Sequence, residues 1–100
     1  MNKLGSLQRR YLRSQAHHLE PIVIIGKHGI IDGTINTINK ALDDRELIKI
    51  KFREFKDKKE SLSSEIAVSV NCHIVGIIGH TVILFRQNTD PDMQNFQLPG

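Results

Sequence analysis

The stretch Ile22-Val23-Ile24-Ile25-Gly26-Lys27-His28-Gly29 decides how this chain can fold. Its first four residues are apolar and β-branched without polar alternation, which predicts a strand covered on at least one face. Asp32 can then cap a helix that ends near Asp43-Asp44, with Ile31 available as a hydrophobic staple. That helix repeats its apolar residues at helical spacing: Ile35, Ile38 and Leu42. The stretch therefore predicts a strand, a short glycine loop and a helix.

A further helix is expected upstream, over about residues 7–18, with Ser6 as its N-cap and Pro21 ending helical geometry after it. Side chains placed about 100° apart give one half of this helix an apolar character: Leu7, Tyr11, Leu12, Ala16 and Leu19. The other half carries four basic side chains: Arg9, Arg10, Arg13 and His17. Such a half is either an ordinary solvated surface or a binding face.

Downstream, residues 47–52 alternate strictly between an apolar face and a face with Lys49 and Lys51, which predicts a half-exposed strand. Residues 57–60 match a capping box for a third helix. That helix is expected to reach Asn71, a residue that tolerates a left-handed helix end. A strand and a helix thus follow the glycine loop and its helix.

Cys72 comes directly after the third helix and is expected to be a small buried hydrophobe. The segments 74–78 and 81–85, separated by Gly79-His80, have the spacing of a tight β-hairpin. Residues 87–100 read as an extended or mobile tail, in which Phe96 and Leu98 can still dock locally.

The order of these elements predicts an α/β fold in a single domain, residues 1–86. Right-handed crossovers must join the first three strands, and a hairpin adds the fourth. The result is a mixed four-stranded sheet with three helices, in the order α-β-α-β-α-β-β. Because Lys49 and Lys51 look towards water, helices are expected to cover mainly one face, in a two-layer arrangement.

Length and composition agree with one small domain: 100 residues with 39% hydrophobic side chains. No apolar run approaches the roughly 20 residues of a membrane span, and the N-terminus lacks the apolar stretch of a signal peptide. With a single cysteine, Cys72, an internal disulfide is excluded, so we expect a cytoplasmic protein. The net charge of +3 is uneven, because residues 1–31 hold five Lys and Arg against one Glu.

The loop Gly26-Lys27-His28-Gly29 is the candidate binding motif. A glycine-x-x-glycine match alone is weak, and Gly76-Ile77-Ile78-Gly79, a second match, lies along a predicted strand and reads as sheet and turn. The first match joins a strand to a helix, and two polar residues separate its glycines. Missing β-carbons, free N–H groups and a helix amino end favour phosphate, as in the K-homology class of RNA-binding modules. The competing interpretation is a tight turn without a ligand.

The basic half of the first helix could approach this loop and form one continuous cationic surface for RNA backbone. The primary candidates to contact RNA are Gly26, Lys27, His28, Gly29, Arg9, Arg10, Arg13 and His17. The second-tier candidates are Lys49, Lys51 and Arg86.

Six segments of the chain resemble the CRM domain, the chloroplast RNA splicing and ribosome maturation family whose stand-alone bacterial members are of the YhbY type: residues 8–13, 16–19, 21–23, 25–29, 46–51 and 78–86. The resemblance implies a fold akin to the C-terminal domain of bacterial initiation factor three and RNA binding through the glycine loop. It also implies association with ribosomal RNA in precursors of the large (50S) subunit. His80 stands where similar proteins often have lysine, so its contribution would be smaller and pH-dependent.

Two other classes of function compete with RNA binding. An enzyme is not expected, because adjacent Cys72 and His73 would point to opposite faces of a strand and no other nucleophile has an evident base. The spacing of the histidines matches no metal-site pattern, so neither a metal nor a cofactor is expected. The serious alternative is a protein-interaction module that binds a ribosomal protein or assembly factor through its open sheet face or an edge strand. In either case we expect the protein to be a monomer.

Overall fold

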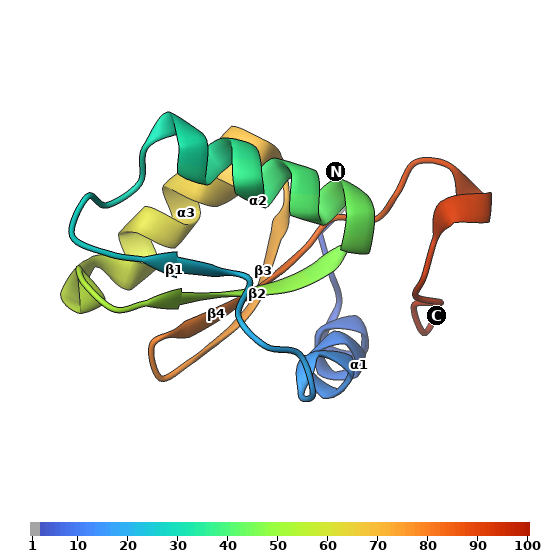
Figure 1. The fold of residues 1–100 in the computed structure, drawn as a ribbon. Helices are drawn as coiled ribbons and strands as arrows, with labels where there is room; N and C mark the ends of the chain where they lie inside the picture. The colour runs from blue at the N-terminus through green and yellow to red at the C-terminus, as the bar shows by residue number, and fades with distance from the viewer. Residues whose placement is uncertain (1–2) are drawn as a thin grey trace.

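A mixed four-stranded sheet lies at the centre of the molecule, in a computed structural model that describes residues 3–100 (Figure 1). Its helices and strands follow the predicted order: α1 (Ser6–Ala16), β1 (Val23–Ile25), α2 (Asp32–Arg45), β2 (Leu47–Phe52), α3 (Lys59–Val70), β3 (His73–Ile78) and β4 (Thr81–Phe85). Two short 3-10 turns, η1 (Lys56–Lys58) and η2 (Pro91–Met93), complete the chain. The predicted fold class, a mixed sheet with three helices, is confirmed.

The strands lie in the order β1-β2-β4-β3, so β1 and β3 form the two edges of the sheet. β1 pairs with β2 in parallel, with Val23 opposite Ile50. β4 lies between β2 and β3 and is antiparallel to both. The first three strands therefore run in one direction, as the crossover connections require, and the carboxyl ends of β1 and β2 meet at the same end of the sheet as the turn between β3 and β4.

Helices α2 and α3 cover one face of the sheet and enclose the larger core. This core takes the apolar face of β2 and the buried side chains of both helices, including Ile48, Ile50, Phe52, Ile38 and Ile66. The alternation of apolar and polar residues in β2 correctly predicted which face of this strand is buried. The core holds α2 against the sheet and thereby positions the glycine loop that precedes α2.

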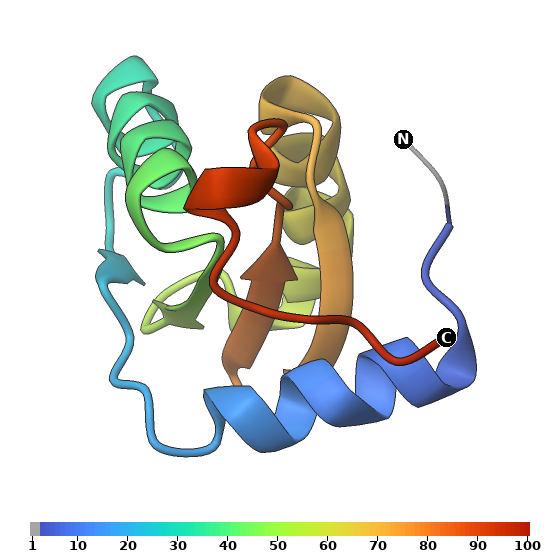
Figure 2. The same ribbon diagram turned by 90° about the vertical axis from the view of Figure 1, so that its right-hand side faces the viewer.

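Helix α1 crosses the opposite face, as Figure 2 shows. Leu12 and Ala16 of α1 are buried there against a second cluster that includes Leu47, Val75, Ile83 and Phe85. The expectation that helices cover mainly one face therefore holds for α2 and α3 but missed α1. The lysines of β2 suggested water on this side, yet Lys49 Nζ donates hydrogen bonds to the carbonyls of His17 (3.4 Å) and Leu19 (3.0 Å) and fixes the end of α1.

Each of the three helix starts differs from the predicted one by one residue. α1 starts after Gly5, not after Ser6, and the N–H of Gly5 donates to Oε1 of Gln8 at 3.0 Å. α2 starts after Ile31, which is largely exposed and does not act as a staple, and Asp32 is its first residue. Asp57 lies inside η1 and does not cap α3. Short polar side chains occur both at N-caps and in first turns, so sequence alone did not separate these positions.

Three predictions around β3 are confirmed. Asn71 ends α3 in the left-handed region, with φ of 54°. Cys72 is buried, and burial raises the pKa of its thiol to about 11, although Arg86 opposes the shift. Gly79 provides the positive φ, 60°, of the turn between β3 and β4. By contrast, Leu7 of α1, which was expected on the apolar half, is 64% exposed.

The residues after β4 fold back over the second cluster. The carboxylate of Glu46, a buried residue with φ of 65°, accepts hydrogen bonds from the backbone N–H groups of Asn88 and Asn95. The rings of Phe96 and Phe85 meet edge to face with centroids 6.2 Å apart. Residues 87–100 are mostly irregular, as expected for a tail, but Phe96 and Leu98 dock as the sequence analysis allowed.

The longest helix within residues 3–100, α2, has 14 residues, fewer than the roughly 20 that a bilayer-spanning helix needs.

Candidate nucleic-acid interface

The glycine loop, residues 26–29, leaves β1 at an edge of the sheet and leads into α2 (Figure 1). The N–H of Gly29 donates to the carbonyl of Gly26 at 3.0 Å, so the four residues form one tight turn. Gly29 has φ of 67°, a conformation that favours glycine. Lys27 and His28, between the two glycines, are both exposed. The loop thus presents two polar side chains on a fixed backbone.

Two other segments lie against the base of this loop. The carbonyl of Ile25 accepts hydrogen bonds from the N–H groups of Arg53 (3.0 Å) and Glu54 (3.1 Å), which follow β2. The carbonyl of His80, in the turn between β3 and β4, accepts from Phe52 N–H at 2.8 Å. Residues 26–29, 51–60 and 79–80 therefore share one end of the molecule, which we call the loop end.

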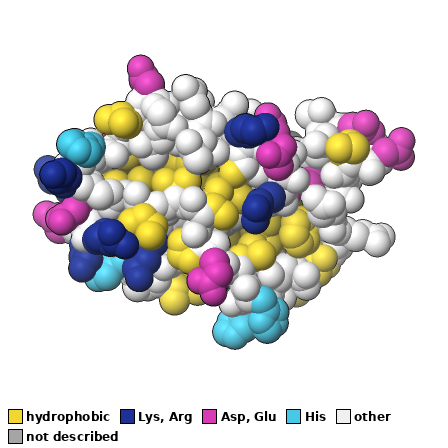
Figure 3. Space-filling view, in the orientation of Figure 1, with side chains coloured by type: hydrophobic (Ala, Val, Ile, Leu, Met, Phe, Trp, Pro, Cys, Tyr) yellow, Lys and Arg dark blue, Asp and Glu magenta, His cyan; other side chains and the backbone are white. Residues whose placement is uncertain are grey.

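The loop end carries a concentration of basic side chains. Figure 3 shows Lys, Arg and His side chains gathered at the left of the view, where the loop end lies. They come from all three segments: Lys27, His28, Lys51, Arg53, Lys56, Lys58, Lys59 and His80. Six of these are Lys or Arg, and the same segments hold three acidic residues, Glu54, Asp57 and Glu60, which leaves a local charge of +3 with histidine neutral.

His80 is a neutral member of this group at physiological pH. Its pKa lies below the ordinary histidine value because of local desolvation and the nearby ammonium groups of Lys59, Lys56 and Lys51. Lys59 Nζ donates to the carbonyl of Gly79 and lies 3.4 Å from Nδ1 of His80. His80 therefore offers a hydrogen-bonding ring rather than a permanent charge.

The arginines of α1 lie elsewhere, which corrects the predicted single cationic surface. The side chain of Arg13 packs on Gly76 of β3: its Cδ is 3.2 Å from the position that a β-carbon on Gly76 would take. Arg9 lies near His73, the first residue of β3, whose pKa is lowered chiefly by burial and to a smaller extent by the charge of Arg9. β3 and β1 are opposite edges of the sheet, about 14 Å apart at the usual strand spacing. A helical projection shows which residues share a face but not which strand that face meets.

The other predicted site residues fall into two groups. Lys51 belongs to the loop end and is exposed, whereas Lys49 holds the end of α1. Arg10 and His17 are exposed on α1 and at its end, away from the glycine loop (Figure 1). Arg86 occupies an internal position between α2 and α3. The structure therefore brings Lys51 to the loop and leaves Arg9, Arg10, Arg13, His17 and Lys49 apart from it.

Arg86 follows β4 and joins α2 to α3. Its guanidinium donates to Oδ1 (2.7 Å) and the carbonyl (2.9 Å) of Asn39, to Oδ1 of Asp43 (2.7 Å) and to the carbonyl of Val70 (2.7 Å). The side chain is only 18% exposed, and Asp43 forms its ion pair. With its donors occupied in this way, Arg86 has a structural role, in contrast to its second-tier place among the predicted RNA contacts.

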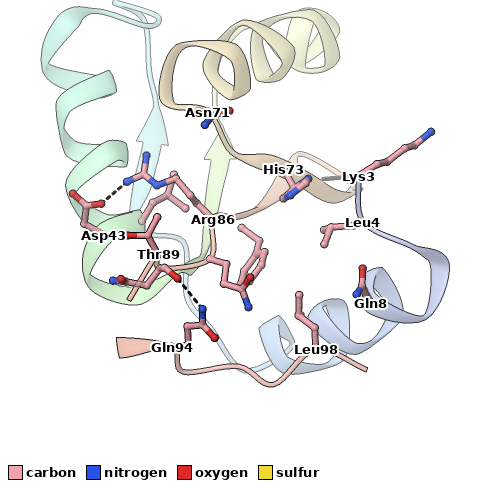
Figure 4. A pocket seen from close by; sticks show the side chains of 14 residues that line it. Lys3, Leu4, Gln8, Asp43, Asn71, His73, Arg86, Thr89, Gln94 and Leu98 are labelled. Atoms are coloured by element: carbon pink, nitrogen blue, oxygen red, sulfur yellow. Dashed lines mark hydrogen bonds and ion pairs between the residues drawn. The ribbon is translucent and has the colours of Figure 1, made fainter. Parts of the chain in front are cut away.

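A hollow of about 670 Å³ lies at the end of the sheet opposite the glycine loop (Figure 4). The start of β3, the end of β4 and the docked C-terminal residues form its wall, with His73, Arg86 and Gln94 among the lining side chains. Residues 3–100 contain no group of three or more His, Cys, Asp and Glu side chains positioned to hold a metal ion. Cys72 beside it is buried as a neutral thiol, a poor nucleophile.

The protein is a small α/β domain. In it, a basic Gly-x-x-Gly turn connects an edge strand of a mixed sheet to a helix. This chain belongs to the CRS1/YhbY (CRM) domain family, whose sequence model matches residues 4–86. The resemblance noted in the sequence is thereby confirmed.

Several relatives share most of this sequence. It is 36% identical to the Bacillus subtilis protein named "Probable RNA-binding protein YqeI", over 87% of this chain and 92% of that one. It is 32% identical to a Haemophilus influenzae protein named "RNA-binding protein", over 94% and 96% of the two chains. The match to "Probable RNA-binding protein MJ0652" of Methanocaldococcus jannaschii is 38% identical over 84% of this chain, which spans 64% of that protein's length.

A solved structure has the same fold. The solution structure of the hypothetical protein SAV1595 from Staphylococcus aureus superimposes with a TM-score of 0.80 at 34% sequence identity. The match covers 97% of this chain and 100% of that one. The α/β arrangement described above is therefore shared with an experimentally determined relative.

The conformation of Gly29 leads to a stability prediction. In Gly29→Ala, a β-carbon at positive φ costs about 1–2 kcal/mol, and it would also lie 3.4 Å from Cε2 of Phe55. We expect the melting temperature to fall by roughly 5–10 °C for a domain of this size. The matched control is Gly26→Ala, because position 26 lies outside the left-handed region and has no atom within 4 Å of the added carbon. Equal melting temperatures for the two variants would contradict this account.

Proposed function

We propose that this protein binds the backbone of single-stranded RNA at the loop end, with the Gly26–Gly29 turn as the clamp. The observation that supports the proposal is the juxtaposition of the exposed Lys27 and His28 with five further Lys and Arg side chains contributed by residues 51–60. The relatives named as RNA-binding proteins support RNA as the ligand.

The turn offers phosphate both amides and charge. Within residues 3–100, the backbone N–H groups of Lys27 and His28 have no protein acceptor, whereas that of Gly29 closes the turn. Small glycines on either side let a sugar-phosphate chain approach these amides. Asp32 lies in the first turn of α2, where its negative charge offsets the helix dipole. The amides and Lys27 therefore contribute more to phosphate binding than the dipole does.

Two arginines of α1, Arg9 and Arg13, lie beside β3, at the edge of the sheet opposite β1. An RNA held at the glycine loop must span the width of the sheet to reach them. We therefore assign the clamp to the loop end and treat Arg9, Arg10 and Arg13 as contacts for a longer or folded RNA. Contacts with the RNA backbone, whether at the loop end or from α1, carry little information about the base sequence.

The RNA that fits the family resemblance is ribosomal RNA in precursors of the large subunit, bound in the cytoplasm. Cross-linking in cells, followed by sequencing of the attached RNA, tests this part of the proposal. Enrichment of large-subunit ribosomal RNA over other abundant RNAs is the expected result. Enrichment of unrelated transcripts would leave RNA binding in place and remove the ribosomal role.

Salt dependence tests RNA binding itself. If about five phosphates are neutralised on single-stranded RNA, log affinity should fall with log salt at a slope of roughly −3.5. Fluorescence anisotropy of a labelled single-stranded RNA over a series of salt concentrations measures this slope. No measurable affinity at low salt would contradict the proposal and favour the alternative, a module that binds a ribosomal protein or assembly factor.

A further inference from the structure

An apolar groove between α2 and α3 opens directly beside the glycine loop. It encloses about 350 Å³, at the low end of the range for small-molecule pockets, about 300–1,000 Å³. Its lining residues come from the loop (Gly29), from α2 (Ile35), from α3 (Leu62) and from the segment before α3 (Phe55). Since Gly29 belongs both to the turn and to the groove, the two are continuous.

Phe55 stands at the mouth of this groove in an unusual conformation. Its backbone is left-handed, with φ of 57° and ψ of 33°, which is strained for a bulky side chain. Phe55 is 37% exposed, and its ring lies beside Gly29, where a β-carbon would be 3.4 Å from Cε2 of the ring. Lys58 N–H donates to the carbonyl of Phe55 at 2.9 Å and holds the turn. Strain that keeps an aromatic ring at a surface is typical of binding sites.

The remaining lining residues combine an apolar floor with a polar rim. Ile30, Ile35 and Leu62 are partly buried against the main core. Lys58, Glu65 and Ser69 supply a cation, a carboxylate and a hydroxyl. A flat, uncharged ring with hydrogen-bonding groups along its edge fits such a site, since the floor and Phe55 contact its faces and the rim meets its edge.

We propose that this groove binds a nucleobase of the RNA whose backbone is held at the glycine loop, with the base stacked on Phe55. This inference rests on the proposed function, because the loop must hold the neighbouring phosphate. The surrounding charge favours this occupant: Lys27, Lys56 and Lys58 attract a polyanion to the groove mouth. A partner helix, about 10–12 Å across, needs a longer groove than one of this volume.

A tryptophan reporter tests the stacking directly. The chain has no tryptophan, so Phe55→Trp creates a single indole at the groove mouth. We expect a single-stranded oligoadenylate to quench its fluorescence, and an abasic oligomer of equal length and charge to leave it unchanged. The matched control is Val68→Trp, because Val68 is 83% exposed on α3 and lies outside the groove. Equal responses of the two indoles would overturn the inference.

Affinity measurements separate this inference from the proposed function. Stacking on an aromatic ring predicts that Phe55→Leu weakens oligoadenylate binding roughly five- to a hundred-fold and leaves binding of the abasic oligomer unchanged. If Phe55→Leu, folded by its melting curve, weakens neither oligomer or both equally, the groove holds no base, although backbone binding stands. If the wild-type protein binds neither oligomer, the proposed function itself fails.

Discussion

The double variant Lys27→Asp with His28→Asp will bind single-stranded RNA at least about tenfold more weakly than the wild type. The slope of log affinity against log salt will become shallower by about one to two. Both side chains are exposed in the turn, so the melting temperature should hardly change. The two aspartates lower the local charge of the loop end from +3 to zero with histidine neutral, and they place carboxylates where phosphate is proposed to lie. Anisotropy titrations over a salt series measure both quantities.

A matched control separates position from net charge. Lys40→Asp makes the same lysine-to-aspartate change, two of the three charge units that the double variant alters, at an exposed site on α2, where Lys40 pairs with Asp44 at 3.7 Å. Only a small, salt-screened loss of affinity is expected from it. Equal losses in Lys40→Asp and in the double variant would mean that overall charge attracts the RNA. Unchanged affinity of the double variant, with a normal circular dichroism spectrum, would remove the loop from the mechanism.

The second large effect concerns stability. Arg86→Met will lower the free energy of unfolding by about 2–4 kcal/mol, because it removes the guanidinium and leaves the partly buried Val70 carbonyl and the Asn39 groups without their donor. Methionine retains much of the aliphatic volume, which limits any added cavity. Urea denaturation followed by circular dichroism measures the change.

The RNA affinity of the folded Arg86→Met protein should stay near the wild-type value at low temperature. Arg10→Met is the control, since it removes one positive charge from an exposed position on α1 and should leave the unfolding midpoint in place. Should Arg86→Met keep wild-type stability and lose RNA affinity instead, the arginine would belong to the interface, as the sequence interpretation first placed it.

Local patterns predicted most of the fold. The β-branched run before Gly26, the alternation in residues 47–52 and the glycine turn at Gly79 each specify their conformation within a few residues. The position of α1 was missed because Lys49 reads as a surface residue, whereas its ammonium satisfies two carbonyls at the end of that helix. Such a long-range bond leaves no periodic signal in the sequence.

The candidate site was predicted only in part, for a similar reason. The turn itself follows from its glycines and its place between strand and helix, and Lys27 and His28 are exposed as expected. The five basic residues between Lys51 and Lys59 were masked by acidic neighbours in a charge average over residues 32–100. A shorter charge window would have revealed them. Their proximity to the turn depends on the parallel pairing of β1 with β2, which no local pattern specifies.

The buried carboxylate of Glu46 bears on where this domain ends. The family match stops at residue 86, but two amides beyond it, at Asn88 and Asn95, donate hydrogen bonds to that carboxylate, and Phe96 packs edge to face on the ring of Phe85. A chain cut at the family boundary would remove both donors to this carboxylate and uncover the apolar surface around Phe85. The folding unit is therefore longer than the stretch that the family model matches, and the final residues form its last structural layer.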